Sequence, residues 1–150
     1  MKALSLNQPW ASLVAVGAKR IETRNWYTSY RGPLAIHATK GFPNGCKALC
    51  DVEPFKRCLR KAKLTAETLP LGEIVAVATI DQCWLVRRGD LLRISDTERA
   101  FGNYEGGRYA WFLKDIKPLP RPIPATGALG LWWVPTHVEL EIERMLKEAS

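Results

Sequence analysis

The spacing of apolar and polar residues along the chain predicts short strands, with one helix near the start and another at the end. Apolar residues recur at helical intervals between Pro9 and Gly17, so a short helix is expected over residues 9–16. Residues 44–63 show a second helical pattern, which Pro54 interrupts. Alternating or β-branched apolar runs predict strands, the first entered from a turn, over residues 19–24, 34–38, 73–80, 108–113 and 130–134.

Three further segments complete the predicted architecture. Residues 96–107 are rich in Gly, Asp and Asn and are expected to form a loop. Prolines at alternate positions over residues 118–124 predict an extended linker across the surface. Thr136 followed by Glu139 is typical of a capping box at the start of a closing helix. Short strands with an early and a late helix indicate an α+β fold, a small mixed β-barrel with flanking helices.

Composition narrows the class of protein. The chain has 150 residues, 47% of them hydrophobic and 25% charged, so residues 1–150 are expected to form one globular domain. No apolar run approaches the roughly 20 residues that a membrane span requires. The N-terminus leads directly into a structured pattern without a signal peptide, so we expect a cytoplasmic protein with no membrane partner and no obligate protein partner.

The net charge of +7 favours anionic partners such as RNA or nucleotides. Basic residues crowd one short segment, at Lys56, Arg57, Arg60, Lys61 and Lys63. Most such runs are solvated helix faces, so the charge alone leaves RNA as an open alternative.

The four cysteines are expected to be reduced thiols, because the chain has no secretion signal and no C-x-x-C pair. Cys46 and Cys50 can share a helix face, with His37 as a third metal ligand, but zinc ligand pairs are usually closer in sequence. We therefore predict no metal site.

Residues 17–24 contain the highest concentration of charged side chains suited to catalysis or anion binding. Strand alternation places Glu22 and Arg24 on one face, so Lys19 has to lie in the preceding turn, or be re-aimed by a β-bulge, to act with Glu22. A charged lysine stabilises an oxyanion, whereas one that burial keeps neutral acts as a base, and a nearby glutamate favours the charged form. The same three side chains can also form a purely structural ion-pair network.

Gly17, Lys19, Glu22 and Arg24 match the G-x-K-x-x-E-x-R signature of the activating signal cointegrator homology (ASCH) domain, which this chain resembles. The resemblance, to the larger bacterial and phage branch of the family, extends over Gln8-Pro9-Trp10-Ala11, Arg31-Gly32, Ile36-His37-Ala38 and Gly106-Gly107-Arg108-Tyr109-Ala110-Trp111. It implies a β-barrel like that of pseudouridine synthase and archaeosine transglycosylase (PUA) domains.

The resemblance also implies two functions. RNA binding has been proposed for ASCH proteins generally, and some members are amidohydrolases that remove the acyl group from N4-acetylcytidine and related N4-acylated cytosines. In the compact bacterial enzyme of this kind a lysine, a threonine and a glutamate act together. The lysine falls on Lys19. The threonine position holds Glu22, a departure that disfavours a threonine nucleophile, and the glutamate falls on Glu105, with Glu98 as the second candidate.

Our leading hypothesis is an amidohydrolase, independent of metal and cofactor, whose substrate is a modified cytosine nucleoside. Water activated by Glu22 or Glu105 attacks the acyl carbon, and Lys19 stabilises the oxyanion. Aromatic and cationic side chains would hold the base, whose stacking contributes about 1–3 kcal/mol. The predicted binding residues are Gln8, Trp10, Arg24, Trp26, Arg31, His37 and Tyr109, although His37 also suits a core position. The alternative is an RNA-binding or RNA-processing module without turnover.

Overall fold

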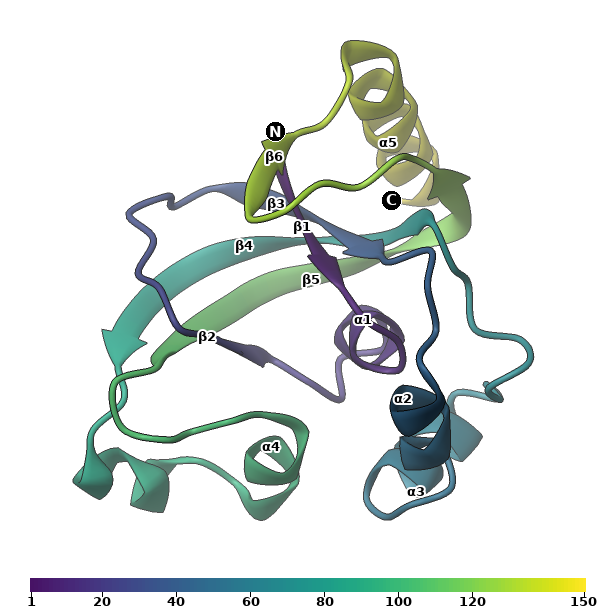
Figure 1. Ribbon diagram of the computed structural model, residues 1–150. Helices are drawn as coiled ribbons and strands as arrows, with labels where there is room; N and C mark the ends of the chain where they lie inside the picture. The colour runs from purple at the N-terminus through teal and green to yellow at the C-terminus, as the bar shows by residue number, and fades with distance from the viewer.

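A computed structural model describes all residues from Met1 to Ser150 and shows a strongly curved mixed sheet with helices outside it (Figure 1). The sheet has six strands in the order β2-β5-β4-β3-β1-β6. The strands are β1 (Lys2–Leu6), β2 (Ile21–Arg24), β3 (Pro33–Ala38), β4 (Glu73–Leu85), β5 (Tyr109–Pro124) and β6 (Leu131–Trp133). The helices are α1 (Trp10–Ala15), α2 (Asn44–Leu49), α3 (Phe55–Lys61), the 3₁₀ turn η1 (Arg88–Arg93), α4 (Asp96–Phe101) and α5 (Thr136–Ala149).

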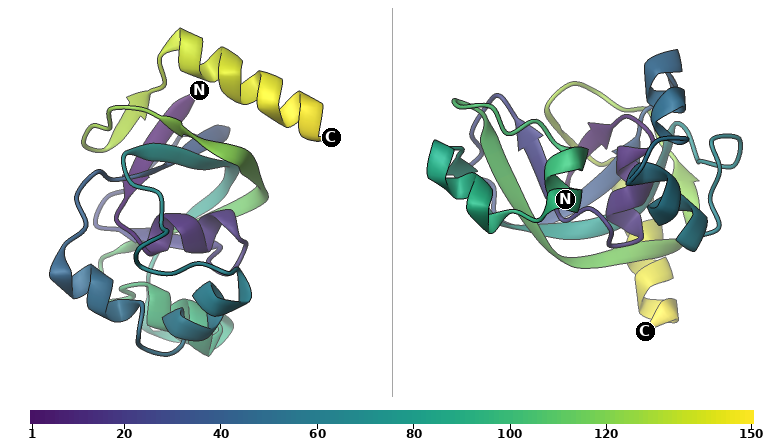
Figure 2. Two further views of the ribbon diagram at one scale, coloured as in Figure 1. Left: turned by 90° about the vertical axis from the view of Figure 1, so that its right-hand side faces the viewer. Right: turned by 90° about the horizontal axis from the view of Figure 1, so that it is seen from below.

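The two longest strands, β4 and β5, form an antiparallel ribbon that gives the sheet its curvature (Figures 1 and 2). Their register shifts at three places, and such bulges bend a strand and increase its twist. β1 pairs with β3 in parallel and with β6 in antiparallel orientation. The predicted α+β fold with flanking helices is therefore confirmed, and the predicted small mixed barrel takes the form of a curled, six-stranded half-barrel sheet.

The sheet separates two hydrophobic cores, and strand alternation assigns residues to each. In β3, Leu34 and Ile36 join the core under α1, whereas Ala35 joins the core under α5. α1 contributes Val14 to the first core, and α5 contributes Ile142 to the second, where its side chain is fully buried. Burying such a side chain stabilises the fold by about 1.5–3 kcal/mol.

The predicted loop over residues 96–107 is wrong for its first half, because α4 occupies residues 96–101. Ser95 is the N-cap of this helix, and its side-chain oxygen accepts a hydrogen bond from the Glu98 amide at 3.1 Å. At the other end Phe101 is buried and packs edge-to-face on Phe55 of α3. Composition alone indicates a loop here, but an N-cap and a buried aromatic residue stabilise a short helix instead.

The proline-rich segment is part of a strand and not a linker. β5 continues to Pro124 and pairs with β4 along this stretch, with Ile123 opposite Ile74. The apolar residues between the prolines, Leu119 and Ile123, are buried, whereas the prolines themselves are exposed. A proline has no amide hydrogen to donate to a neighbouring strand, so a proline-rich segment is not expected to be a strand. Prolines are nevertheless tolerated where a strand is irregular, and this segment is such a case.

The predicted capping box is also wrong. α5 begins at Thr136 after Pro135, with no side-chain hydrogen bond at its N-cap. Glu139 instead binds the N-terminal ammonium of Met1 at 2.5 Å, which ties the N-terminus to the closing helix. None of the helices is both long and apolar enough to span a membrane.

Candidate active site

The turn between α1 and β2, together with β2 itself, positions the three charged residues of the signature. Gly17 adopts φ +80°, a conformation that favours glycine, and this ends α1. The amides of Ala18 and Lys19 both donate to the Leu13 carbonyl at 3.0 Å, which fixes the turn. As predicted, Lys19 therefore lies in the turn before the strand, and β2 follows as an edge strand paired with β5.

The three side chains form one chain of ion pairs. Lys19 Nζ lies 3.5 Å from Glu22 Oε1, and Arg24 Nη2 lies 3.2 Å from Glu22 Oε2. Glu22 Oε1 also accepts a hydrogen bond from the Thr23 amide at 3.0 Å. The lysine is completely buried and donates as well to the Ile21 carbonyl, whereas 12% of the glutamate side chain is exposed. The carboxylate thus has one cation behind it and another beside it.

Glu22 and Arg24 line a pocket of about 570 Å³ between the end of β1, α1, β2 and the segment after α4. Trp10 forms part of its wall, held there because its indole nitrogen donates to the Phe101 carbonyl at 2.7 Å. The other lining side chains include Asn7, Thr23, Thr39, Phe55, Asn103 and Arg108. A pocket of this size, lined mainly by polar and charged side chains with Trp10 and Phe55 beside them, suits a small polar organic ligand.

Residues 102–108 are attached to β2 through Thr23. The Thr23 hydroxyl accepts from the Asn103 amide at 3.0 Å, and its carbonyl accepts from Arg108 Nη2 at 3.2 Å. Arg108 Nε also donates to the Asn103 carbonyl at 3.0 Å. These contacts place Asn103 and Arg108 in the pocket. Sequence reasoning missed both residues, because they reach β2 from about 80 positions away.

Of the predicted site residues, Trp10, Glu22 and Arg24 lie together in this pocket. Lys19 lies behind Glu22 and does not line the pocket. Glu105 is exposed and outside this pocket, and its amide donates to the Asn103 side chain at 3.1 Å. Glu22 is therefore the carboxylate that reaches the cavity.

Four other predicted binding residues lie elsewhere. Gln8 is fully buried and bonds to Ser12 and to the Pro70 carbonyl, so it joins α1 to a neighbouring loop. Trp26 packs edge-to-face on Trp111 at 4.7 Å between ring centroids. Arg31 is exposed and bonds to carbonyls of its own loop, and Tyr109 packs against Tyr27. All four have structural partners and none lines the pocket.

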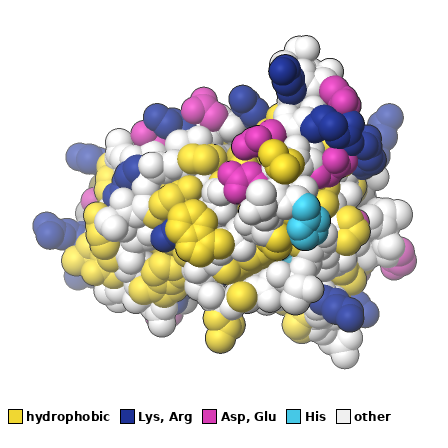
Figure 3. All heavy atoms as spheres, turned by 90° about the horizontal axis from the view of Figure 1, so that it is seen from above, with side chains coloured by type: hydrophobic (Ala, Val, Ile, Leu, Met, Phe, Trp, Pro, Cys, Tyr) yellow, Lys and Arg dark blue, Asp and Glu magenta, His cyan; other side chains and the backbone are white.

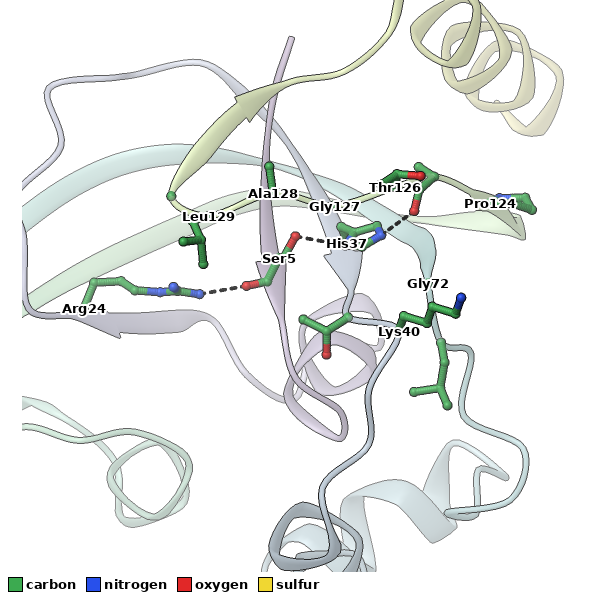
Figure 4. Close-up of a pocket in the computed structure, with 14 residues that line it drawn as sticks. Ser5, Arg24, His37, Lys40, Gly72, Pro124, Thr126, Gly127, Ala128 and Leu129 are labelled. Atoms are coloured by element: carbon green, nitrogen blue, oxygen red, sulfur yellow. Dashed lines mark hydrogen bonds between the residues drawn. The ribbon is translucent and has the colours of Figure 1, made fainter.

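His37 lies in an adjoining pocket of about 890 Å³, bordered by the loop that follows β5 (Figure 4). Its ring nitrogens bond to the Ser5 hydroxyl at 2.9 Å and to the Ala125 carbonyl at 2.8 Å. A carbonyl only accepts, so Nε2 carries the proton and Nδ1 accepts from Ser5. Burial lowers the pKa of His37, outweighing the carbonyl contact. Ser5, Arg24 and Thr39 line both pockets.

A second acidic residue, Glu98, lies near Lys19. Glu98 Oε2 accepts from the Arg20 amide at 2.6 Å, whereas its Oε1 is buried without a hydrogen-bond partner, as is the Tyr104 hydroxyl. Burial raises the pKa of Glu98 more than the Arg20 amide and the Lys19 charge lower it. Burial also raises the pKa of Tyr104, as do the charges of Glu98 and Glu22.

The structure brings no three His, Cys, Asp or Glu side chains into a metal-binding group. All four cysteines are free, and burial raises the pKa of Cys46 and Cys50, which favours the protonated thiol. The arrangement that Cys46, Cys50 and His37 would need for a metal is not formed.

The ASCH domain family model matches residues 4–120, and the chain belongs to the ASCH domain family. Proteins of this family are proposed RNA-binding or RNA-processing modules. The chain is 56% identical over 57 residues to activating signal cointegrator 1 of Homo sapiens and of Mus musculus. This match covers 38% of the chain but only 10% of each of those proteins.

Solved structures of an ASCH protein from Zymomonas mobilis share the fold. A mutant of that protein with tyrosine replaced by phenylalanine has 15% identity and a TM-score of 0.56, with 96% of each chain covered. A second mutant, with serine replaced by alanine, has 16% identity and a TM-score of 0.57, with 95% of this chain and 94% of that one covered. At this identity the likeness shows the fold alone.

Proposed function

We propose that the protein is an amidohydrolase that removes the acyl group from N4-acylated cytosine nucleosides such as N4-acetylcytidine. The observation that carries this proposal is the Glu22 carboxylate, which reaches the pocket while two cations and the Thr23 amide hold it in place. A carboxylate fixed in a pocket can orient a water molecule and accept its proton, which typically accelerates a reaction by about 10²–10⁴-fold.

The reaction adds water across the amide bond. Glu22 takes a proton from water as its oxygen attacks the acyl carbon, and the carbonyl oxygen becomes an oxyanion. Arg24, the cation of the pocket that lies beside Glu22, can stabilise this oxyanion. The bond from carbon to N4 then breaks, the proton passes from Glu22 to N4, and cytidine and the carboxylic acid are released.

Lys19 takes a different role here from the one expected from sequence. Its ammonium is buried behind Glu22, with the Ile21 carbonyl as its other partner. We therefore assign Lys19 to hold Glu22 in its orientation, and Arg24 to meet the oxyanion. The indole of Trp10 offers an apolar face for the cytosine ring within the same cavity.

The direct test is release of cytidine and acetate from N4-acetylcytidine by the purified protein. Glu22→Gln should lower kcat by about 100-fold or more, because the amide cannot accept the proton. Lys19→Ala should lower kcat as strongly, while circular dichroism shows the fold retained. The matched control is Glu143→Gln, an exposed position on α5. Unchanged turnover in folded Glu22→Gln protein, or in folded Lys19→Ala protein, would overturn the assignment.

A second candidate function is RNA binding without turnover. Its support is the position of α3, where Phe55 lines the pocket and exposed Lys56, Arg60 and Lys61 lie on the same helix. On the face seen from above, by contrast, Lys and Arg side chains are mixed with acidic ones and surround hydrophobic ones (Figure 3).

RNA held through phosphates would lose affinity linearly in log salt, with a slope of about −0.7 per single-strand phosphate contact. Charge reversal at Arg60 should reduce that slope, with Arg57→Glu tested beside it. Arg57 already contacts Glu53 and Thr97, so its reversal should have the smaller effect. If RNA affinity is absent at low salt, or is the same after both reversals, this second function is wrong.

A further inference from the structure

The charges lining the larger pocket all have one sign. Arg24 and Lys40 are part of its lining, and no Asp or Glu is. His37 adds no charge at neutral pH, because burial lowers its pKa and both ring nitrogens already have partners. A cavity of about 890 Å³ with two cations and no lining carboxylate attracts anions.

The donors around this pocket are largely unused by the protein. Arg24 bonds only through Nη2, to the Ser5 carbonyl at 2.9 Å and to Glu22 at 3.2 Å, which leaves Nε and Nη1 without a protein partner. Lys40 takes part in none of the ion pairs. The backbone amides of residues 126–130 donate no hydrogen bond within the protein. Phosphate-binding sites in proteins are typically built from such guanidinium, ammonium and backbone amide donors.

The loop that carries these amides is held in place from both sides. The Ala125 amide donates to the Gly72 carbonyl at 3.1 Å, and the Ala125 carbonyl accepts from His37. Gly127 lies so close to His37 and Ser5 that an added Cβ would be 2.6 Å from the imidazole ring. In Figure 4 the loop runs across Ser5 and His37, with Arg24 on one side of Ser5 and Lys40 on the other. The donors are therefore arranged before any ligand arrives.

The two pockets adjoin each other at the residues they share, Ser5, Arg24 and Thr39. A nucleoside whose base lies beside Trp10 and Glu22 would direct its ribose toward these shared residues. We propose that the larger pocket binds a phosphate group carried by that nucleoside, through Lys40 and the amides of residues 126–130, while the charge of Arg24 at the boundary of the two pockets attracts it without direct contact. This inference rests on the proposed function for the position of the base, and it assigns the substrate to the nucleotides rather than to free nucleosides.

The test is equilibrium binding by calorimetry, which requires no turnover. The probes are cytidine, cytidine 5′-monophosphate and the dinucleotide adenylyl-(3′→5′)-cytidine, each titrated into the full chain. The native protein should bind the monophosphate or the dinucleotide at least about tenfold more tightly than cytidine, because charge-assisted hydrogen bonds are strong. Lys40→Ala should remove most of that preference and leave the affinity for cytidine unchanged. Lys117→Ala, an exposed position outside both pockets, is the matched control.

The outcomes separate the two proposals. A preference for phosphate that depends on Lys40 supports the subsite even if N4-acetylcytidine is not hydrolysed. Hydrolysis of N4-acetylcytidine without such a preference overturns the subsite and leaves the proposed function intact. Failure of all three probes to bind overturns the subsite as well. The tighter of the two phosphate probes identifies the source, a free nucleotide for the monophosphate and an RNA chain for the dinucleotide.

Discussion

Lys19 Nζ and Glu22 Oε1 lie 3.5 Å apart across the boundary of the pocket, with the lysine completely buried and the carboxylate exposed to the cavity. A buried ammonium needs partners, and Lys19 has Glu22 and the Ile21 carbonyl. The pair therefore joins stability to function, because the contact that satisfies the lysine also fixes the group that faces the substrate.

Removing only the lysine of this pair should reduce the free energy of unfolding more than removing both charges does. Lys19→Met leaves Glu22 without its inner cation and should reduce the free energy of unfolding by about 3–5 kcal/mol. The double variant Lys19→Met with Glu22→Gln should be the more stable of the two, since no charged carboxylate then faces the buried methionine, and Arg24, which loses its partner, is 27% exposed to solvent. Urea denaturation of both variants and of Lys117→Met, an exposed control, measures the difference. A double variant less stable than Lys19→Met would contradict this account.

His37 should make stability depend on pH. Burial lowers the pKa of His37, so the folded state binds fewer protons than the unfolded chain. The stability of the folded protein is therefore lost as the pH falls from about 6.5 through the folded-state pKa. Protonation would also place a donor at Nδ1, where the Ser5 hydroxyl now donates.

Urea denaturation between pH 5 and pH 8 measures this loss. His37→Gln should flatten the pH dependence of the free energy of unfolding, because the amide does not titrate. His137→Gln is the matched control, since the only other histidine is exposed at the start of α5. Equal pH dependence in the His37→Gln and native proteins would show that this residue is not the source.

The sequence was sufficient to predict the local arrangement of residues 17–24 because its determinants are local. A glycine ends the helix, the turn places Lys19, and the strand that follows carries Glu22 and Arg24. The rest of the pocket depends on contacts between distant segments. Asn103 and Arg108 enter it only through Thr23, and no local pattern records that contact.

The dependence on contacts between distant segments also explains the errors in the predicted fold. Hydrophobic periodicity is a local signal, so it identified the buried part of β4 but not the exposed end that continues to Leu85. β1 was not predicted, because five residues give little periodicity and its position between β3 and β6 depends on pairing across the chain. The loop over Ser5 and His37 has no charged or aromatic side chain that would indicate a binding role in the sequence, because the donors it offers to the pocket are backbone amides.

Gly127 should be required for the position of that loop. An added Cβ would lie 2.6 Å from His37 Cε1 and 2.7 Å from the Ser5 hydroxyl, closer than such atoms approach. Gly127→Ala should reduce the free energy of unfolding by about 1–3 kcal/mol, as overpacking usually does. Gly106→Ala is the control, because a Cβ there meets no atom within 4 Å. Thermal denaturation compares them, and equal melting temperatures would show that the loop moves aside without cost.

Glu98 should give a pH dependence of the opposite sign to that of His37. Burial raises the pKa of Glu98, so the folded state holds its proton more tightly than the unfolded chain does. Its contribution to stability is therefore present below about pH 4 and is lost as the pH rises through the folded-state pKa. Glu98→Gln keeps an oxygen for the Arg20 amide and removes the charge.

The free energy of unfolding of Glu98→Gln, relative to the native protein, should therefore increase as the pH rises from about 4 through the folded-state pKa of Glu98 and then level off. Glu105→Gln, at an exposed carboxylate in the segment that follows α4, is the control. A Glu98→Gln protein that loses stability relative to the native one over this range would show that the attraction of Lys19 for the Glu98 carboxylate outweighs its burial. In that case Lys19 would be held by two charged carboxylates, and the double variant at Lys19 and Glu22 would leave Glu98 unpaired.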